Sequence, residues 1–159
     1  MHTTDLWSFA LACYARPRVE RLCLELQEQG VDICLLLCGA WLEARAISCT
    51  PQRLERLRQL AGHWQHEVVT PLRSLRQNWR DAAQSDLQMK ALREQLKALE
   101  LAAEKTLLGR LERETQYWPT QSGPAPWLEP LTGCVRDGDA AREFLRRTAA
   151  AAQLELAGA

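Results

Sequence analysis

The segment Gly30-Val-Asp-Ile-Cys-Leu-Leu-Leu-Cys-Gly-Ala-Trp41 decides the fold of this chain. It is almost entirely apolar, and its one charged residue, Asp32, lies where a helix would begin and where a carboxylate meets the positive end of the helix dipole. A helix without a polar face has to be covered by other helices on all sides. The sequence therefore predicts a buried central helix over about residues 31–45.

Apolar residues recur three and four positions apart on both sides of this segment, which is the spacing of one face of a helix. One such stripe lies in residues 6–14 and another in 54–79, where Pro71 is expected to break or kink the helix near Thr70. The longest helix is expected over about 86–117 with Ser85 as its cap, and its apolar face comprises Met89, Leu92, Leu96, Leu99, Ala103, Leu107 and Leu111. These patterns predict an all-α, single-domain helical bundle.

The composition changes after Trp118. Prolines and glycines are frequent in residues 119–136, so we expect an irregular connection between a bundle core at 1–118 and an alanine-rich helix at 137–159. The apolar face of that last helix is thin, which predicts weak packing on the core. Within the connection, Trp127 is either a contact site for another protein or part of a clip that folds onto the bundle.

The totals limit the classes of function. The formal net charge is zero, which argues against a general attraction to nucleic acid or to anionic membranes. Residues 45–80 are locally basic, but Trp64 and Trp79 lie on the apolar stripe there and are interpreted as core residues. The chain start lacks a signal-peptide pattern, and no apolar run reaches the ~20 residues of a membrane span, so we expect a cytoplasmic protein.

Several short motifs occur together in this chain. They are Leu6-Trp7-x-Phe9-Ala10 with Tyr14, Cys23-Leu24-x-Leu26-Gln27, Gly30-x-Asp32-Ile33-x-Leu35-Leu36-Leu37 with Trp41, Trp64 with Val68-Val69-x-Pro71-Leu72-Arg73-x-Leu75-Arg76, and Glu100-Leu101-x-Ala103-Glu104. Over about residues 5–112 the chain resembles an uncharacterised proteobacterial, Pseudomonas-type family of short all-helical proteins, a domain of unknown function. The resemblance implies a fold and a lineage but no activity. Cys34 stands where that family's pattern leads us to expect Asn.

A metal site is one hypothesis. Cys34 and Cys38 are four residues apart on one predicted helix, and His63 and His66 are three apart on another. Two thiolates and two imidazoles would complete the tetrahedral shell of zinc. The alternative is that the cysteines fill the core and the histidines lie at the surface. We favour this alternative and expect no cofactor.

Five charged residues inside the motifs form a candidate ligand site: Asp32, Arg73, Arg76, Glu100 and Glu104. The two arginines share one helical face and the two glutamates share another, so adjacent helices would bring them together. Two interpretations remain open. The residues form either a polar pocket for an anionic or amphipathic small molecule or a structural network of ion pairs.

The sequence contains no glycine-rich phosphate loop and no nucleophile elbow. We therefore expect a non-enzymatic adaptor or regulatory module that contacts another protein, with homo-oligomerisation left open. The alternative is a small-molecule-binding protein or an unrecognised enzyme with a pocket near Asp32, Arg73 and Glu100. A closed cavity of roughly a few hundred cubic ångströms with converging polar groups would favour the second function. An exposed apolar patch without such a cavity would favour the first.

Overall fold

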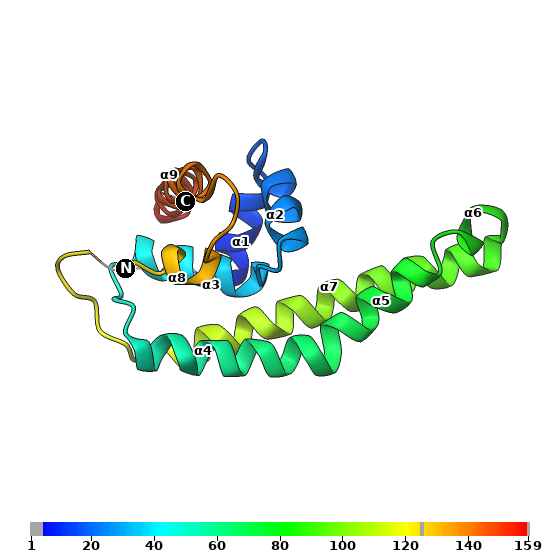
Figure 1. Ribbon diagram of the computed structural model, residues 1–159, viewed down its shortest axis with the longest axis horizontal. Helices are drawn as coiled ribbons and strands as arrows, with labels where there is room; N and C mark the ends of the chain where they lie inside the picture. Colours follow the sequence, from blue (N-terminus) through cyan, green and yellow to red (C-terminus); the bar gives the residue numbers. More distant parts are fainter. Residues whose placement is uncertain (1–4, 125, 159) are drawn as a thin grey trace.

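The computed structural model describes residues 5–124 and 126–158, and every regular element within these ranges is a helix (Figure 1). The elements are α1 (Leu6–Tyr14), α2 (Val19–Glu28), α3 (Ile33–Ala44), α4 (Pro51–Trp64), the π-helical segment η1 (Gln65–Val69), α5 (Thr70–Asn78), α6 (Ala82–Ser85), α7 (Leu87–Thr115), α8 (Leu128–Thr132) and α9 (Gly138–Ala157). The all-α fold class predicted from the sequence is confirmed.

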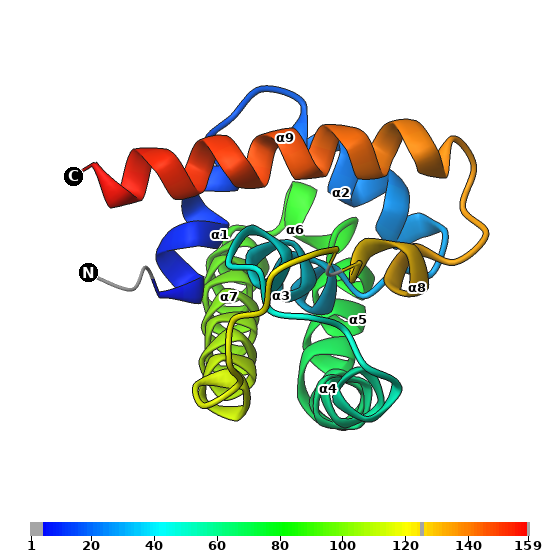
Figure 2. The same cartoon turned by 90° about the vertical axis from the view of Figure 1, so that its left-hand side faces the viewer.

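Helix α3 is the centre of the fold, as its apolar sequence predicts. All nine residues from Cys34 to Leu42 are buried. Helices α1, α2, α4, α7, α8 and α9 all contact it. Figure 2 shows α3 in the middle, with α9 crossing on one side and α4 and α7 lying on the other.

The turn into α3 is fixed by two residues. Gly30 has a positive φ of 91°, which glycine adopts without strain, and it ends α2. The Asp32 carboxylate then accepts a hydrogen bond from the backbone N–H of Leu35 at 3.1 Å, so it caps α3 as expected. The expected cap at Ser85 is wrong, because α6 ends there and Asp86 caps α7 by accepting from the backbone N–H of Gln88 and Met89.

The segment α4–η1–α5 runs antiparallel to α7 and forms a long hairpin, with α6 at its turn. The distal half of this hairpin, residues 70–99, projects away from the other helices and is called the arm (Figure 1). Only two long helices pack there, so the side chains of Leu92 and Leu99 are 50% and 54% exposed. The apolar stripe of α7 is therefore buried only in part, at Leu96 and over its C-terminal half.

Pro71 changes the helix without ending it. Proline has no N–H to donate to the carbonyl four residues earlier. The preceding turn, η1, takes the wider π-helical form, and α5 continues directly from it. Figure 1 shows the resulting bend between α4 and α5. Of the two outcomes expected near Thr70, a break or a kink, the structure has the kink.

The connection after Trp118 is partly helical, because α8 lies within it. Trp127 is completely buried, stacks on Trp118 with ring centroids 6.1 Å apart, and donates from Nε1 to the Ile47 carbonyl at 2.7 Å. The Glu43 carboxylate accepts from the Trp127 backbone N–H at 2.8 Å. Trp127 therefore holds this segment on the body, which fits the clip and not an exposed contact site for a partner.

Helix α9 packs across α1 and α3. Its buried residues are Gly138, Ala141, Leu145, Thr148, Ala149 and Ala152. Small side chains let α9 approach closely, so a thin stripe still gives extensive contact. The helix is part of the hydrophobic core, in contrast to the weak packing expected from its sequence.

Candidate functional site

The arginines and glutamates of the sequence motifs do meet. Arg73 donates from Nε to Glu100 at 3.0 Å and from Nη2 to Glu104 at 3.0 Å, and Arg76 Nε lies 2.5 Å from Glu100. Glu100 is only 7% exposed. Burial raises its pKa, but the hydrogen bonds from Arg76 and Arg73 outweigh burial and leave the pKa below its ordinary value. These four residues form an ion-pair network between α5 and α7.

A pocket of about 520 Å³ lies beside this network. Helices α1, α3 and α7 supply most of its walls, and its apolar lining is Trp7, Ala10, Leu11, Val31, Ile33, Leu37, Leu101 and Leu108. Leu11 and Leu101 are 51% and 54% exposed. The pocket is therefore open to solvent on one side and presents hydrocarbon there.

Polar groups also line the pocket. Asp32, Gln65, Arg73 and Glu104 all contribute, and Gln65 Nε2 donates to Asp32 Oδ1 at 3.2 Å. Three of the five predicted ligand residues, Asp32, Arg73 and Glu104, thus face the pocket, whereas Arg76 and Glu100 stand behind them in the network.

The carboxylates of the pocket are incompletely compensated. Burial raises the pKa of Asp32, and the hydrogen bonds from Leu35 and Gln65 offset this only in part. Burial also raises the pKa of Glu104, against the lowering effect of Arg73. With the network included, three carboxylates face two guanidinium groups. One negative charge is in excess.

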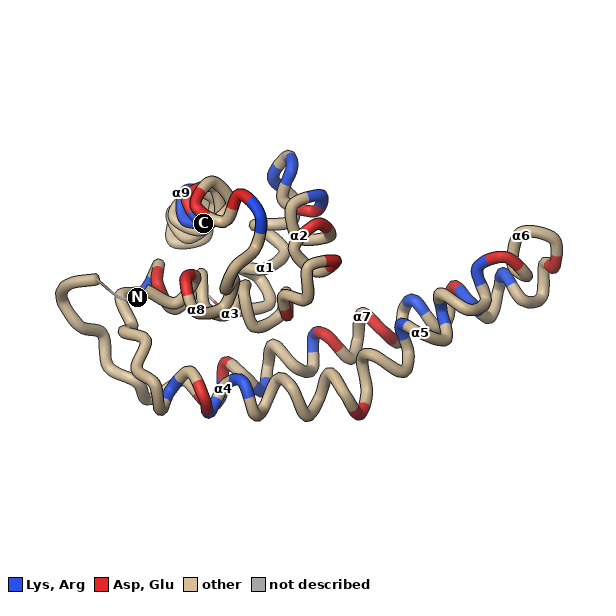
Figure 3. Tube along the Cα trace, viewed as in Figure 1, with Lys and Arg blue, Asp and Glu red and all other residues tan. Residues whose placement is uncertain are grey.

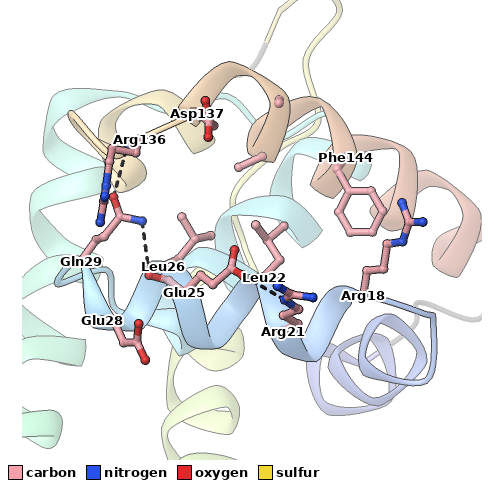
Figure 4. A pocket seen from close by; sticks show the side chains of 12 residues that line it. Arg18, Arg21, Leu22, Glu25, Leu26, Glu28, Gln29, Arg136, Asp137 and Phe144 are labelled. Carbon is pink, nitrogen blue, oxygen red and sulfur yellow. Dashed lines mark hydrogen bonds and ion pairs between the residues drawn. The ribbon is translucent and has the colours of Figure 1, made fainter.

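A second hollow of about 950 Å³ lies between α2 and α9 (Figure 4). Its polar side chains interact locally, since Arg21 pairs with Glu25 at 3.1 Å and the Gln29 side chain accepts from the backbone N–H of Arg136 at 2.9 Å. Cations and carboxylates are both at its edge and are exposed to water. This groove therefore lacks the buried, converging polar groups of the pocket between α1, α3 and α7.

The four residues of the zinc hypothesis do not form a site. Cys34 and Cys38 are buried in the core, whereas His63 and His66 are exposed on the hairpin. Burial raises the pKa values of the Cys34 and Cys38 thiols well above the ordinary value for cysteine. This disfavours the thiolate form that zinc requires. Within residues 5–124 and 126–158, no group of three or more His, Cys, Asp or Glu side chains could hold a metal ion.

The basic segment of the hairpin is partly neutralised by ion pairs. Arg56 pairs with Glu114 at 2.7 Å, and Arg73 and Arg76 pair with the glutamates of α7. Figure 3 shows blue and red positions mixed along the hairpin. Trp64 is partly buried and donates from Nε1 to the Ala103 carbonyl at 2.9 Å, which is a structural role.

Fold and pocket together define a class: an all-helical protein with a buried central helix, a projecting hairpin and a half-open pocket beside it. Within the described residues, no helix is long and apolar enough to cross a membrane. The chain belongs to a protein family of unknown function, DUF2390, whose model matches residues 5–111. No curated protein and no solved structure matches the chain.

The matched range has a structural meaning. It begins at α1 and ends near the last turn of α7, so it includes every residue that lines the pocket. Helices α8 and α9 and one wall of the α2–α9 groove lie outside it. Among the pocket residues, Gln65 carries no signal in the sequence, whereas Tyr14 and Leu101 belong to the motifs but were not assigned to a site.

Proposed function

We propose that this protein binds a small molecule with an apolar body in the pocket between α1, α3 and α7. The observation that supports this is the combination of hydrocarbon walls with a few buried polar groups, which is typical of ligand sites. The volume of about 520 Å³ also falls in the range of roughly 300–1,000 Å³ found for such sites.

Binding without catalysis fits the lining residues. Cys34 is the thiol in the pocket, and burial raises its pKa well above the ordinary value, so it is a poor nucleophile. Asp32 is held by its role as the cap of α3, and Glu104 is held by its ion pair with Arg73.

The cysteines are all free, which is typical of a reducing compartment and supports a cytoplasmic location.

The test is titration with Nile red, a neutral apolar dye whose fluorescence rises in apolar surroundings. We expect saturable binding of one dye per chain. Leu101→Ala should weaken binding about fivefold, because the substitution removes about 1 kcal/mol of apolar contact at the mouth of the pocket. Leu24→Ala is the matched control, since Leu24 on α2 is 55% exposed and does not line the pocket. Equal effects of the two substitutions, or no saturable binding, would refute the proposal.

We propose adaptor activity as a second function, carried by the arm. Its two-helix construction leaves Leu75, Leu92 and Leu99 exposed by 39–54%, which is the kind of apolar surface that protein partners cover. The partner is another protein or a second copy of this chain. Analytical ultracentrifugation of the purified protein tests whether a second copy is the partner. Self-association through the arm predicts that the wild-type protein is a dimer and that the double variant Leu92→Ser/Leu99→Ser is a monomer. A monomeric wild-type protein would exclude self-association.

A further inference from the structure

Among the described residues that line the pocket, the one cation is Arg73, and it is already ion-paired. Arg73 is its guanidinium group, and both Nε and Nη2 already donate to glutamates at 3.0 Å. An anion that reached Arg73 would lie close to the carboxylates that already pair with it, and Asp32 lines the same pocket. The anionic ligand considered from the sequence is therefore disfavoured by the arrangement of charges.

The carboxylates, in contrast, have acceptor capacity to spare. An ionised carboxylate offers about four lone-pair positions. The hydrogen bonds to Asp32 from the Leu35 N–H and the Gln65 amide both go to Oδ1. Arg73 binds Glu104 through Oε1. A donor that enters the pocket can therefore bind Asp32 without breaking its cap of α3.

The remaining charge in the pocket is negative. Three carboxylates face two guanidinium groups, and the pKa of Asp32 and that of Glu104 are both raised because burial opposes ionisation. A cation next to Asp32 would supply the missing compensation in a region where water screens charge poorly. The walls formed by Trp7, Leu11 and Leu101 would cover an attached hydrocarbon group.

From this arrangement we infer that the ligand is an amine: a protonated nitrogen that binds Asp32, attached to an aliphatic or aromatic body that fills the space between α1 and α7. This inference rests on the proposed ligand-binding function and specifies its chemistry. It assigns Asp32 the role of recognising the charged group and the apolar walls the role of accepting the body of the ligand.

Three compounds with one carbon skeleton test the inference: 4-phenylbutylamine, 4-phenylbutanol and 4-phenylbutanoate, each titrated calorimetrically into the full chain. We expect the amine to bind at least tenfold more tightly than the alcohol, because a hydrogen bond between charged groups is stronger than a neutral one. The anionic compound, 4-phenylbutanoate, should bind most weakly. An anion attracted by Lys105, which lies 5.2 Å from the Trp7 ring centroid, would reverse this order and overturn the inference.

Asp32→Asn separates charge from shape. We expect this substitution to weaken binding of the amine about tenfold, because the charge is lost. Binding of the alcohol should stay unchanged within about twofold, because Asn caps helices as well as Asp and the fold is kept. Asp86→Asn is the matched control, since Asp86 also caps a helix but lies at the tip of the hairpin. It should change neither affinity.

The outcomes distinguish the inference from the function on which it rests. If the alcohol binds as tightly as the amine, or if Asp32→Asn weakens both equally, the amine assignment is wrong and the binding function stands. If none of the three compounds binds, the amine assignment is wrong, and the Nile red titration decides whether the binding function stands. Should Asp32→Asn fail to fold, the comparison of the three compounds on the wild-type chain decides alone.

Discussion

Asp32 combines two roles at one position, as the cap of α3 and as a carboxylate of the pocket. These roles respond differently to substitution. Asp32→Asn keeps the cap and removes a charge that burial disfavours, so the free energy of unfolding at neutral pH should be equal to wild type or higher. Asp32→Ala should lose about 1 kcal/mol because the Leu35 N–H is left without its acceptor. Urea denaturation measures both, and a lower stability of the Asn variant would contradict the account.

The raised pKa of Asp32 also predicts a pH dependence. The folded state holds a proton at higher pH than the unfolded state, whose carboxyl titrates near 3.8. The contribution of Asp32 to wild-type stability must therefore fall as pH rises from the ordinary pKa through the raised one. The difference in stability between Asp32→Asn and wild type should grow over this interval and then stay constant. A difference that is independent of pH would show that the carboxylate is not destabilised by burial.

Glu100 is the residue on which the ion-pair network depends. Glu100→Gln leaves Arg73 and Arg76 without their shared carboxylate in a site that is mostly shielded from water. We expect a loss of about 2 kcal/mol in the free energy of unfolding, below the range for fully buried pairs because both arginines are partly exposed. Glu94→Gln, which removes an exposed pair with Lys97, should cost less than about 0.5 kcal/mol.

At the scale of single helices, Gly39 fixes how closely α8 approaches α3. A Cβ at this position would lie 2.5 Å from Leu131 Cδ1 and 3.2 Å from Trp127 Cβ. At Gly109 in α7, a Cβ would meet no atom within 4 Å. Gly109→Ala should therefore stabilise the protein by about 0.5–1 kcal/mol through helix propensity, whereas Gly39→Ala should destabilise it by about 1 kcal/mol. Thermal unfolding of the two variants should show shifts of opposite sign.

The individual helices show what the sequence could and could not predict. The continuous apolar run of α3 and its Asp32 cap identified the central helix, because a helix without a polar face is stable only where other elements cover it. Helices α6 and α8 were missed, since elements of four and five residues are too short to show a periodic pattern. The exposure of Leu92 was also missed, because a two-helix hairpin and a larger bundle require the same spacing of apolar residues.

At the scale of the whole molecule, the pocket joins α1 near the start of the chain to α7 about a hundred residues later. The sequence indicated its charged members through their spacing on helical faces. It could not indicate the apolar walls, because leucines that line a pocket and leucines that fill a core have the same periodicity. It also gave no sign that α5 and the start of α7 project from the body.

This architecture predicts unequal local stability. Helix α3 and the C-terminal half of α7 are surrounded by other helices, whereas no residue of α5 is buried. Amide hydrogen exchange should be slowest in α3 and should become faster along α7 from Leu107 toward Leu87. Uniform protection along α7 would mean that the arm is covered in solution, as self-association would require.

The central claim is that the pocket between α1, α3 and α7 holds an amine. The most direct measurement is a crystal structure of the full chain with 4-phenylbutylamine. The account predicts the phenyl ring between α1 and α7 and the nitrogen about 3 Å from an oxygen of Asp32. A ligand bound in the groove between α2 and α9, or one in the pocket whose nitrogen points away from Asp32, would contradict it.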